Sequence, residues 1–425
     1  MRQKLLFFFI IFQFFFLQLH AQPTTTGNRD VDIINAERLY LFNPDPNTSI
    51  QRMAGNVQLR QGNSLFYADS CEINNTTNIF EAWGRVHIND SDTTHIFSDY
   101  LRYIGNTKIA FFNRNVRLTD GQGTLTTNEL EYDMNSNIGT YKNGGRVVNK
   151  KSVLTSREGV YYTDVKDIYF KGNVVLTDPS YNLKSDSLLY NTQTQVARFI
   201  AETFIKDSSG RTIQTREGYY DLANKKSEFT SRTHIEDGAL KITGDRIVSD
   251  DTTGVVQIDG RGVLIDTAQG VNILANRIFA NKKTAAYLAT QKPLMIIKQD
   301  NDSIYIAADT LFSARLTDLY KGNDSLLKQL NLKEKDSTNR YFEAFRNVRV
   351  FTDSLQTVSD SLFYTFKDST FELYQNPIVW SRKSQITGDT IFLFTKNKKA
   401  DRIKVFLNSL MINEVEGGVY NQIKS

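Results

Sequence analysis

The fold of this chain is decided by residues 55–88, which read GNVQLRQGNSLFYADSCEINNTTNIFEAWGRVHI. A Val-x-Leu strand opens the stretch after a Gly-Asn turn, and a similar strand returns at Val86 and Ile88. Val57 and Val86 are 29 residues apart (86 − 57), and Val116 follows 30 residues later (116 − 86). A fixed period of this size indicates a repeat array in which each unit buries its apolar face against its neighbours.

A second marker recurs inside each unit, where an acidic or amide residue precedes another strand. Asp69 stands two residues before Cys71 and Asp99 two residues before Leu101, and a large residue such as Tyr103 often comes two residues later. A spacing of two places these side chains on one face of a strand. A third strand then leads into the next unit. The pattern therefore predicts three short strands per unit, joined by turns rich in Asn and Asp.

These units predict an all-β chain of about eleven units of ~30 residues, with mainly antiparallel strands. We expect repeats over residues 31–316 and again over 341–425. Residues 317–340 between them are rich in Lys, Asp, Asn and Ser. They are interpreted as a charged insertion, with a degenerate unit as the alternative, and a short surface helix is compatible with their sequence. Another unit starts at residues 416–420 and stops at Ser425, as expected if the native sequence continues further.

The N-terminus has the pattern of an export signal. Two basic residues precede an almost continuous apolar run over residues 5–19, and Ala21 offers a small residue for cleavage. This predicts a signal peptide over residues 1–21. An uncleaved anchor helix is the alternative, although the run is short for a span of ~20 residues.

Composition excludes several classes of function. The chain of 425 residues has a formal charge of only +4, so it lacks the concentrated basic face of a nucleic-acid binder. One cysteine and four histidines leave little for metal chemistry, and His87 and His95 have no cysteine nearby. The acidic markers recur in every unit, whereas an active site would occupy one. We therefore expect no enzyme activity, no metal and no cofactor, and Cys71 is interpreted as a small buried hydrophobe.

The residues most relevant to binding are the aliphatic side chains that repeat on one face without polar interruption. Stacking the units aligns the valines into one stripe and the second-marker residues into another. An open groove and a closed core both require such stripes, so the pattern leaves the two open. The candidate lining residues are Val57, Leu59, Val86, Ile88, Leu101, Val116, Leu118, Leu130, Val147, Val174, Leu176 and Leu188.

The repeated combination resembles a known family. The Gly-Asn-Val-x-Leu strand, the Ala/Ser-Asp-x-Leu-x-Tyr strand and the third strand together are similar to the organic-solvent-tolerance (OstA-like) domain, with the best units at 55–83, 84–112, 172–200 and 346–374. That family includes the periplasmic, LptA-like bridge proteins of lipopolysaccharide transport. The resemblance implies an elongated β-jelly-roll, or β-taco, with a hydrophobic groove along its length.

The resemblance also implies a function. It predicts a periplasmic bridge that carries lipopolysaccharide or another acylated lipid from the inner to the outer membrane, and association with the outer membrane is left open. Its implied partners are inner-membrane and outer-membrane transport components of the same jelly-roll type, and further copies of the chain in head-to-tail association through strand pairing. The alternative from the residues alone is a structural β-solenoid fibre or surface adhesin with a closed core.

Overall fold

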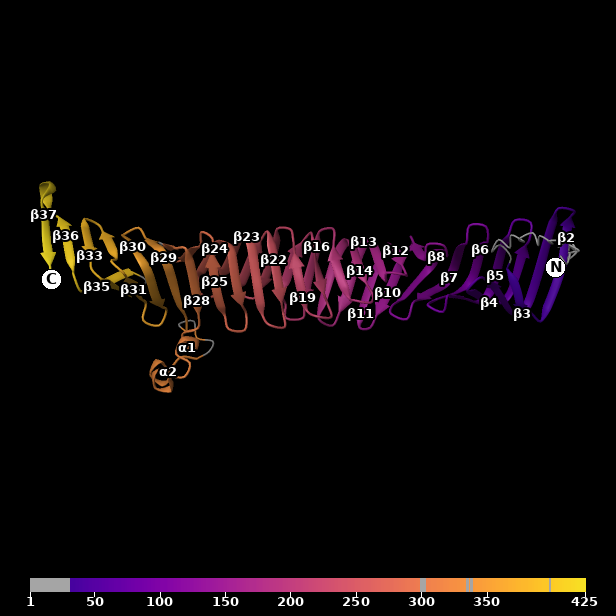
Figure 1. Ribbon diagram of the computed structural model, residues 1–425, viewed down its shortest axis with the longest axis horizontal. Coiled ribbons are helices and arrows are strands. Elements are labelled where there is room, and N and C mark those ends of the chain that lie inside the picture. Colours follow the sequence, from indigo (N-terminus) through magenta and orange to yellow (C-terminus); the bar gives the residue numbers. More distant parts are fainter. Residues whose placement is uncertain (1–30, 299–302, 334–335, 337–338, 397–398) are drawn as a thin grey trace, which may run out of the picture.

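The computed structural model describes residues 31–298, 303–333, 336, 339–396 and 399–425. The expected signal peptide at residues 1–21 lies outside them. Figure 1 shows one long molecule in which strands follow each other from the N-terminal end to the C-terminal end. Nearly every described residue is in a strand or a turn, and each ladder is antiparallel. The predicted fold class, an elongated all-β jelly-roll array, is confirmed.

The strands β3–β8 have 10 to 14 residues, and long strands recur in pairs further along, as β13 with β14, β23 with β24 and β29 with β30, between groups of strands with 4 or 5 residues. The first group is β1 Asp32–Asn35, β2 Arg38–Asp45, β3 Thr48–Gln61, β4 Ser64–Asn74, β5 Ile79–Asp90, β6 Thr94–Ile104, β7 Ile109–Thr119 and β8 Thr124–Asp133. The central group is β9 Ile138–Tyr141, β10 Gly145–Asn149, β11 Ser152–Ser156, β12 Glu158–Tyr162, β13 Asp167–Asp178, β14 Tyr181–Asn191, β15 Val196–Phe199, β16 Thr203–Asp207, β17 Thr212–Thr215, β18 Gly218–Asp221, β19 Lys226–Phe229, β20 Thr233–Asp237, β21 Leu240–Gly244 and β22 Arg246–Asp250.

The remaining strands surround two short helices, α1 Leu316–Leu319 and α2 Asp324–Leu330. They are β23 Val255–Asp266, β24 Val271–Asn281, β25 Ala286–Thr290, β26 Leu294–Lys298, β27 Ser303–Ala307, β28 Thr310–Ala314, β29 Tyr341–Phe351, β30 Leu355–Thr365, β31 Thr370–Tyr374, β32 Ile378–Ser381, β33 Ser384–Thr387, β34 Thr390–Lys396, β35 Lys399–Phe406, β36 Leu410–Glu414 and, after a 3-10 turn at Glu416–Gly418, β37 Tyr420–Lys424.

A long strand bends once near its middle, and this bend divides the molecule into two walls. In β5 the pairing register shifts between Trp83 and Val86, where Gly84 has φ +74° and Arg85 φ +45°. Residues with positive φ turn a strand without ending its ladder. In β13 the half before the bend pairs with β12 and the half after it pairs with β11, so the two halves belong to separate ladders.

We call the line of bends the corner and the two ladders wall A and wall B. Wall A holds the segments on the β11 side of the bend, and wall B holds those on the β12 side. The opposite side of the molecule, where the turns of the two walls meet, is called the mouth. The sequence predicted three short strands in each unit. From β3 to β8 this prediction is wrong, because the Gly-Asn and Gly-Arg turns that mark a unit boundary lie inside single bent strands.

The acidic markers lie at the corner, next to the bend of the following long strand. Asp69 accepts a hydrogen bond from Arg85 Nε at 2.7 Å, and Asp99 accepts one from Asn115 Nδ2 at 2.7 Å. A carboxylate that bonds a left-handed residue of the adjacent strand holds both bends in register. These residues, which the sequence placed at turns or strand entries, have this structural role in the corner.

The insertion forms a projection between β28 and β29, visible below the array in Figure 1. Helix α2 begins where the Asn323 side chain accepts a hydrogen bond from the Leu326 backbone N–H, and it ends at Asn331 with φ +44°. A short surface helix, which the sequence interpretation allowed, is therefore present, and α1 begins at Leu316, one residue before the expected insertion. Neither helix in the described part of the chain has the length or apolar run of a membrane span. The division into repeats at 31–316 and 341–425 remains a prediction.

Candidate functional site

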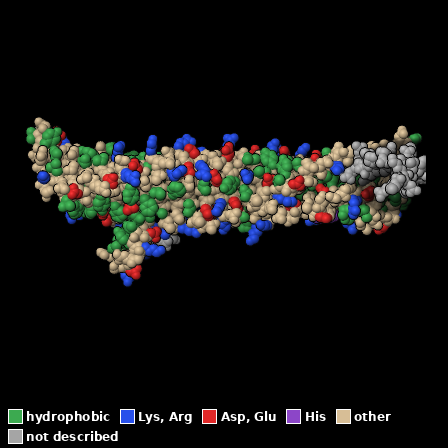
Figure 2. All heavy atoms as spheres, in the orientation of Figure 1, with side chains coloured by type: hydrophobic (Ala, Val, Ile, Leu, Met, Phe, Trp, Pro, Cys, Tyr) green, Lys and Arg blue, Asp and Glu red, His purple; other side chains and the backbone are tan. Residues whose placement is uncertain are grey.

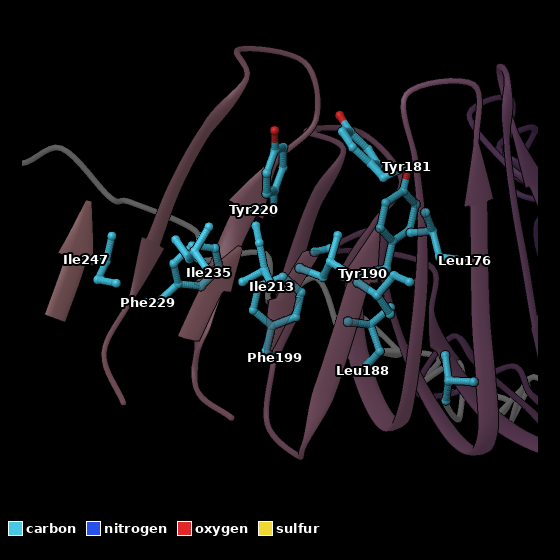
Figure 3. Packing of buried hydrophobic residues seen from close by; sticks show 14 of the residues in the cluster. Leu176, Tyr181, Leu188, Tyr190, Phe199, Ile213, Tyr220, Phe229, Ile235 and Ile247 are labelled. Atoms are coloured by element: carbon cyan, nitrogen blue, oxygen red, sulfur yellow. The ribbon is translucent and has the colours of Figure 1, made fainter. Parts of the chain in front are cut away.

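All twelve predicted lining residues lie on the inner faces of the walls, in one hydrophobic cluster that runs the length of the array. Each is at most 2% exposed, because alternate residues of every strand point inward. Figure 3 shows the same arrangement in the centre, with Leu176, Leu188, Ile213 and Ile235 packed between the walls. Whether these residues contact a lipid stays a prediction.

One alignment within the lining is wrong. Val147 pairs with Leu125 and Leu154, and these belong to the row of Leu118, not to the row of Val116. Val116 instead pairs with Thr127, and Thr127 pairs with Gly145 on its other side. The reason is the bend before β10, where the left-handed residue is Gly144. Gly145 therefore takes the inward position nearest the corner, and Val147 takes the next inward position along the strand.

The lining also has polar interruptions that the sequence interpretation excluded. Buried hydroxyl groups follow the corner on the inside of wall A, where Thr203 donates to Ser185 at 3.0 Å and Thr215 shares a 2.8 Å bond with Thr233. Buried hydroxyls must be bonded to offset their lost hydration, and these largely bond one another or nearby backbone carbonyls. The corner of the channel is therefore polar in the centre of the array, whereas the space between the walls is apolar. The buried members of this row include Ser98, Ser156, Thr203, Thr215 and Thr233.

The mouth is closed by side chains that reach from one wall to the other. Tyrosines of wall B recur along it, and their hydroxyls bond residues at the ends of wall A strands: Tyr103 bonds Gln61, and Tyr132 donates to Asp90 at 3.3 Å. In Figure 3 the hydroxyls of Tyr181 and Tyr220 point to the same side, away from the aliphatic layer. We call this set the seam. Its further contacts are Tyr161 to Asp120, Lys166 to Asp120, Asn149 to Thr192, Lys150 to Gln195, Arg211 to Asp251 and Lys282 to Asp237.

Arg211 makes the most extensive contacts in the seam. Its Nη1 and Nη2 donate to the two carboxylate oxygens of Asp251, both at 2.9 Å, and its Nε donates to Asp207 at 2.9 Å. Tyr220 donates to the same Asp251 at 2.8 Å. Burial alone would raise the pKa of Asp251, but the hydrogen bonds and charge of Arg211 outweigh it and lower the pKa below its ordinary value.

Asp120 is held in a similar way. Its carboxylate accepts hydrogen bonds from the Gln122 and Gly123 backbone N–H groups, both at 3.0 Å, from the Tyr161 hydroxyl, and Lys166 Nζ lies 3.2 Å away. Burial raises the pKa of Asp120, and these donors more than compensate and lower it. The segment around Gly123 is therefore a turn, as the sequence predicted. The other Gly-x-Gly match is not a turn: Gly260 and its neighbours form the bend inside β23.

The interior between β24 and β28 leaves little free space. A cavity beside Tyr287 and Arg340 has a volume of only ≈ 10 Å³, about enough for a single water molecule. Arg340 lies between this cavity and the mouth. It donates hydrogen bonds to Ser313 Oγ and the Ala285 carbonyl, and its guanidinium carbon lies 4.8 Å from the centre of the Tyr287 ring. This part of the interior is thus filled by its own side chains, and Arg340 covers it at the mouth.

Sequence reasoning missed the seam, although one signal was available. The recurring tyrosines are visible in the sequence, but a spacing of two from Val160 points to Tyr162, which is 40% exposed, whereas the buried tyrosine of this unit is Tyr161. Among the described residues no three His, Cys, Asp or Glu side chains are grouped as a metal site would need. His87 Nε2 and His95 Nδ1 do contact one another at 3.1 Å, so these two histidines are not isolated.

A family model agrees with the resemblance. A family model described as OstA-like protein matches residues 29–186, which confirms the predicted relationship over that stretch. Among solved structures, a match is the crystal structure of LptH, the LptA-homologous periplasmic component of the conserved lipopolysaccharide transport device from Pseudomonas aeruginosa. It has 10% sequence identity and a TM-score of 0.18, and the match covers 43% of this chain and 93% of LptH. No curated protein matches this sequence.

Proposed function

We propose that the protein is a non-enzymatic, lipid-conducting bridge of the periplasm, which carries lipopolysaccharide from the inner toward the outer membrane. The observation that carries the proposal is the single hydrophobic cluster, which is enclosed by two walls and continuous from Met53 to Leu393. An aliphatic lining attracts acyl chains without directional bonds, so a chain can pass from one unit to the next without a large barrier. The OstA-like match over the first part of the chain supports the same conclusion.

Conduction requires the mouth to open, because a charged headgroup cannot enter the apolar interior. The contacts across the mouth are made by side chains, whereas strand pairing runs within each wall. Separating the contacts of one unit, such as Tyr132 with Asp90, costs about 1–3 kcal/mol. Each buried methylene of an acyl chain returns about 0.8 kcal/mol, so two to four methylenes offset the opening of one unit. Lipid would therefore open the mouth locally as it advances.

The two ends of the array support head-to-tail association and docking to membrane components of the same jelly-roll type. Among the described residues, β1 and β2 pair only with β3, and β37 pairs only with β36. Leu41 in β2 is 71% exposed and Ile423 in β37 is 64% exposed. A free strand edge with exposed apolar side chains can be extended by another strand.

A photo-crosslinking amino acid in the lining tests the proposal in cells. At Leu118 or Leu188 it should capture lipopolysaccharide, because both side chains face the channel. At Asn137 or Lys225, which lie in turns, it should not.

The filled interior and closed seam favour a second candidate function, a structural solenoid with a permanently closed core. It predicts that lining and turn positions crosslink equally poorly while the protein remains folded and exported. That result would replace the conducting bridge with the structural solenoid.

A further inference from the structure

The outer face of wall A carries a row of neighbouring side chains that the lipid channel does not use. Strand register places Phe97 beside Arg117, Arg117 beside Thr126, and Thr126 beside Arg146. These residues alternate with the buried lining, so they point away from the channel. The row then continues without a carboxylate through Thr155, Val175, Lys184, Phe204, Gln214 and His234.

A hollow of ≈ 640 Å³ lies over the first part of this row. Arg117 and Arg146 line it on either side of Thr126, and Gly144 leaves room at the corner, since a Cβ added there would meet nothing within 4 Å. Asn115, Asn128 and Asn143 complete the lining. The side-chain N–H groups of Asn115 and Asn143 donate to Asp99 and Glu129, both at 2.7 Å, so these two amides present their carbonyl oxygens to a ligand.

The arginines of this hollow are available to a ligand. The Arg117 guanidinium lies 4.2 Å from the centre of the Phe97 ring, which is itself stacked on His87 at 4.3 Å, so the aromatic stack orients Arg117. Within the described residues, neither Arg117 nor Arg146 is in a salt bridge, and both are exposed. Two guanidinium groups on either side of a hollow, with hydroxyl and amide groups between them, are suited to hold an oxyanion.

A second hollow of ≈ 550 Å³ lies further along the same face, over β14, β16, β17 and β20. Lys184 and Lys206 line it together with Phe204, which is 53% exposed. Its one carboxylate, Glu236, is bound by Lys241 at 2.9 Å. Asn182, Gln214 and His234 supply further polar groups.

The two hollows therefore share one composition of cations, amides and an aromatic ring. Five strand spacings separate β8 from β16 in wall A, through β10, β11, β13 and β14, which corresponds to roughly 24 Å. The equivalent outer row of wall B differs, because it contains Glu81, Glu131 and Glu228. A ligand that prefers wall A must be long, hydrophilic and negatively charged.

We propose that the outer face of wall A binds an anionic glycan, a saccharide chain that carries phosphate or carboxylate groups. The arginines and lysines bind the anionic groups, and the amide and hydroxyl side chains bind sugar hydroxyls. The site lies outside the lipid channel, so it does not depend on lipid conduction. Its ligand comes either from the sugar portion of a lipopolysaccharide or from the cell-wall polymer that a periplasmic bridge crosses.

Binding of the full-length protein to three glycans tests this proposal. The probes are the phosphorylated oligosaccharide of delipidated lipopolysaccharide, soluble peptidoglycan chains with their carboxylates, and neutral dextran. At least one anionic probe should bind, more weakly at high salt, and dextran should not. The anionic probe that binds identifies the source of the ligand.

Matched variants locate the site. R117Q/R146Q in the first hollow and K184Q/K206Q in the second should each weaken binding about tenfold or more, because each removes two charge-assisted contacts. R102Q/R198Q removes two exposed arginines from the outer row of wall B and should bind like the wild type. The proposal is overturned if neither anionic glycan binds, if dextran binds equally well, or if the wall B variant loses as much affinity as the others.

Discussion

Replacing Arg211 by Met should destabilise the centre of the array by about 3 kcal/mol. The side chain is only 8% exposed and holds two carboxylates, Asp207 and Asp251, through three hydrogen bonds of 2.9 Å. Removing one partner of a buried ion pair leaves the other charge uncompensated, which costs about 3–5 kcal/mol. The lower end applies here because the side chain of Asp251 is 24% exposed and regains some hydration.

The assay is hydrogen exchange of the backbone amides in β17 and β22, since a repeat protein opens locally. A double-mutant cycle with Asp251→Asn isolates the pair, and the coupling free energy should be about 2 kcal/mol. Lys241→Met removes an exposed pair with Glu236 and should change protection by less than about 1 kcal/mol. A coupling below about 0.5 kcal/mol would refute the argument that the seam holds the walls together.

The same pair should make stability depend on acidity. The pKa of Asp251 is lowered in the folded protein, because Arg211 and Tyr220 outweigh the effect of burial. A carboxyl group with a lowered pKa stabilises the fold above its unfolded pKa of about 4, and this contribution is lost as pH falls below that value. Protection of β17 should therefore decrease from pH 5 toward pH 3 in the wild type, and decrease less in the Asp251→Asn variant.

Three other outcomes are expected. Cys71 should resist thiol reagents in the native state, because burial raises the pKa of its thiol to about 12; rapid labelling without denaturant would contradict this. Gly84→Ala should lower the free energy of unfolding by about 1–3 kcal/mol, since Gly84 has φ +74° and an added Cβ would meet Asp69, and unchanged chemical denaturation would show that the corner is more tolerant. Cysteines replacing Lys150 and Gln195, whose side chains meet at 3.0 Å across the mouth, should stop lipid transport once joined by a short crosslinker; transport by the joined protein would rule out opening of the seam there.

The elements that depend on local patterns were predictable from the sequence. Leu118 and Leu188 are buried as expected, because alternation within one strand decides which face a residue occupies. The residues of the bends were recognised in the sequence but interpreted as turns between strands. Gly84 and Arg85 have positive φ, which is common to turns and to bends within a strand, so their identity alone does not decide whether the strand pairing continues past them.

The seam could not be predicted, because its partners depend on how the two walls are aligned. Tyr132 and Asp90 are 42 residues apart, and Lys282 and Asp237 are 45 apart, so each contact joins strands of different units. No periodicity within a strand encodes that offset. The outer hollows could not be predicted for the same reason, since Arg117 and Arg146 become neighbours only when β7, β8 and β10 pair.

The corner contacts have a consequence for how such a molecule can change its length. Asp309 binds Asn347, which is 38 residues away, at 3.1 Å even though the projection with α1 and α2 intervenes, whereas Asp69 and Arg85 make the same kind of contact 16 residues apart. The corner contacts therefore form independently of what is attached at the mouth. Selection can duplicate a unit to extend the reach of the molecule, or enlarge a loop at the mouth to acquire a new appendage, without altering the rest of the architecture.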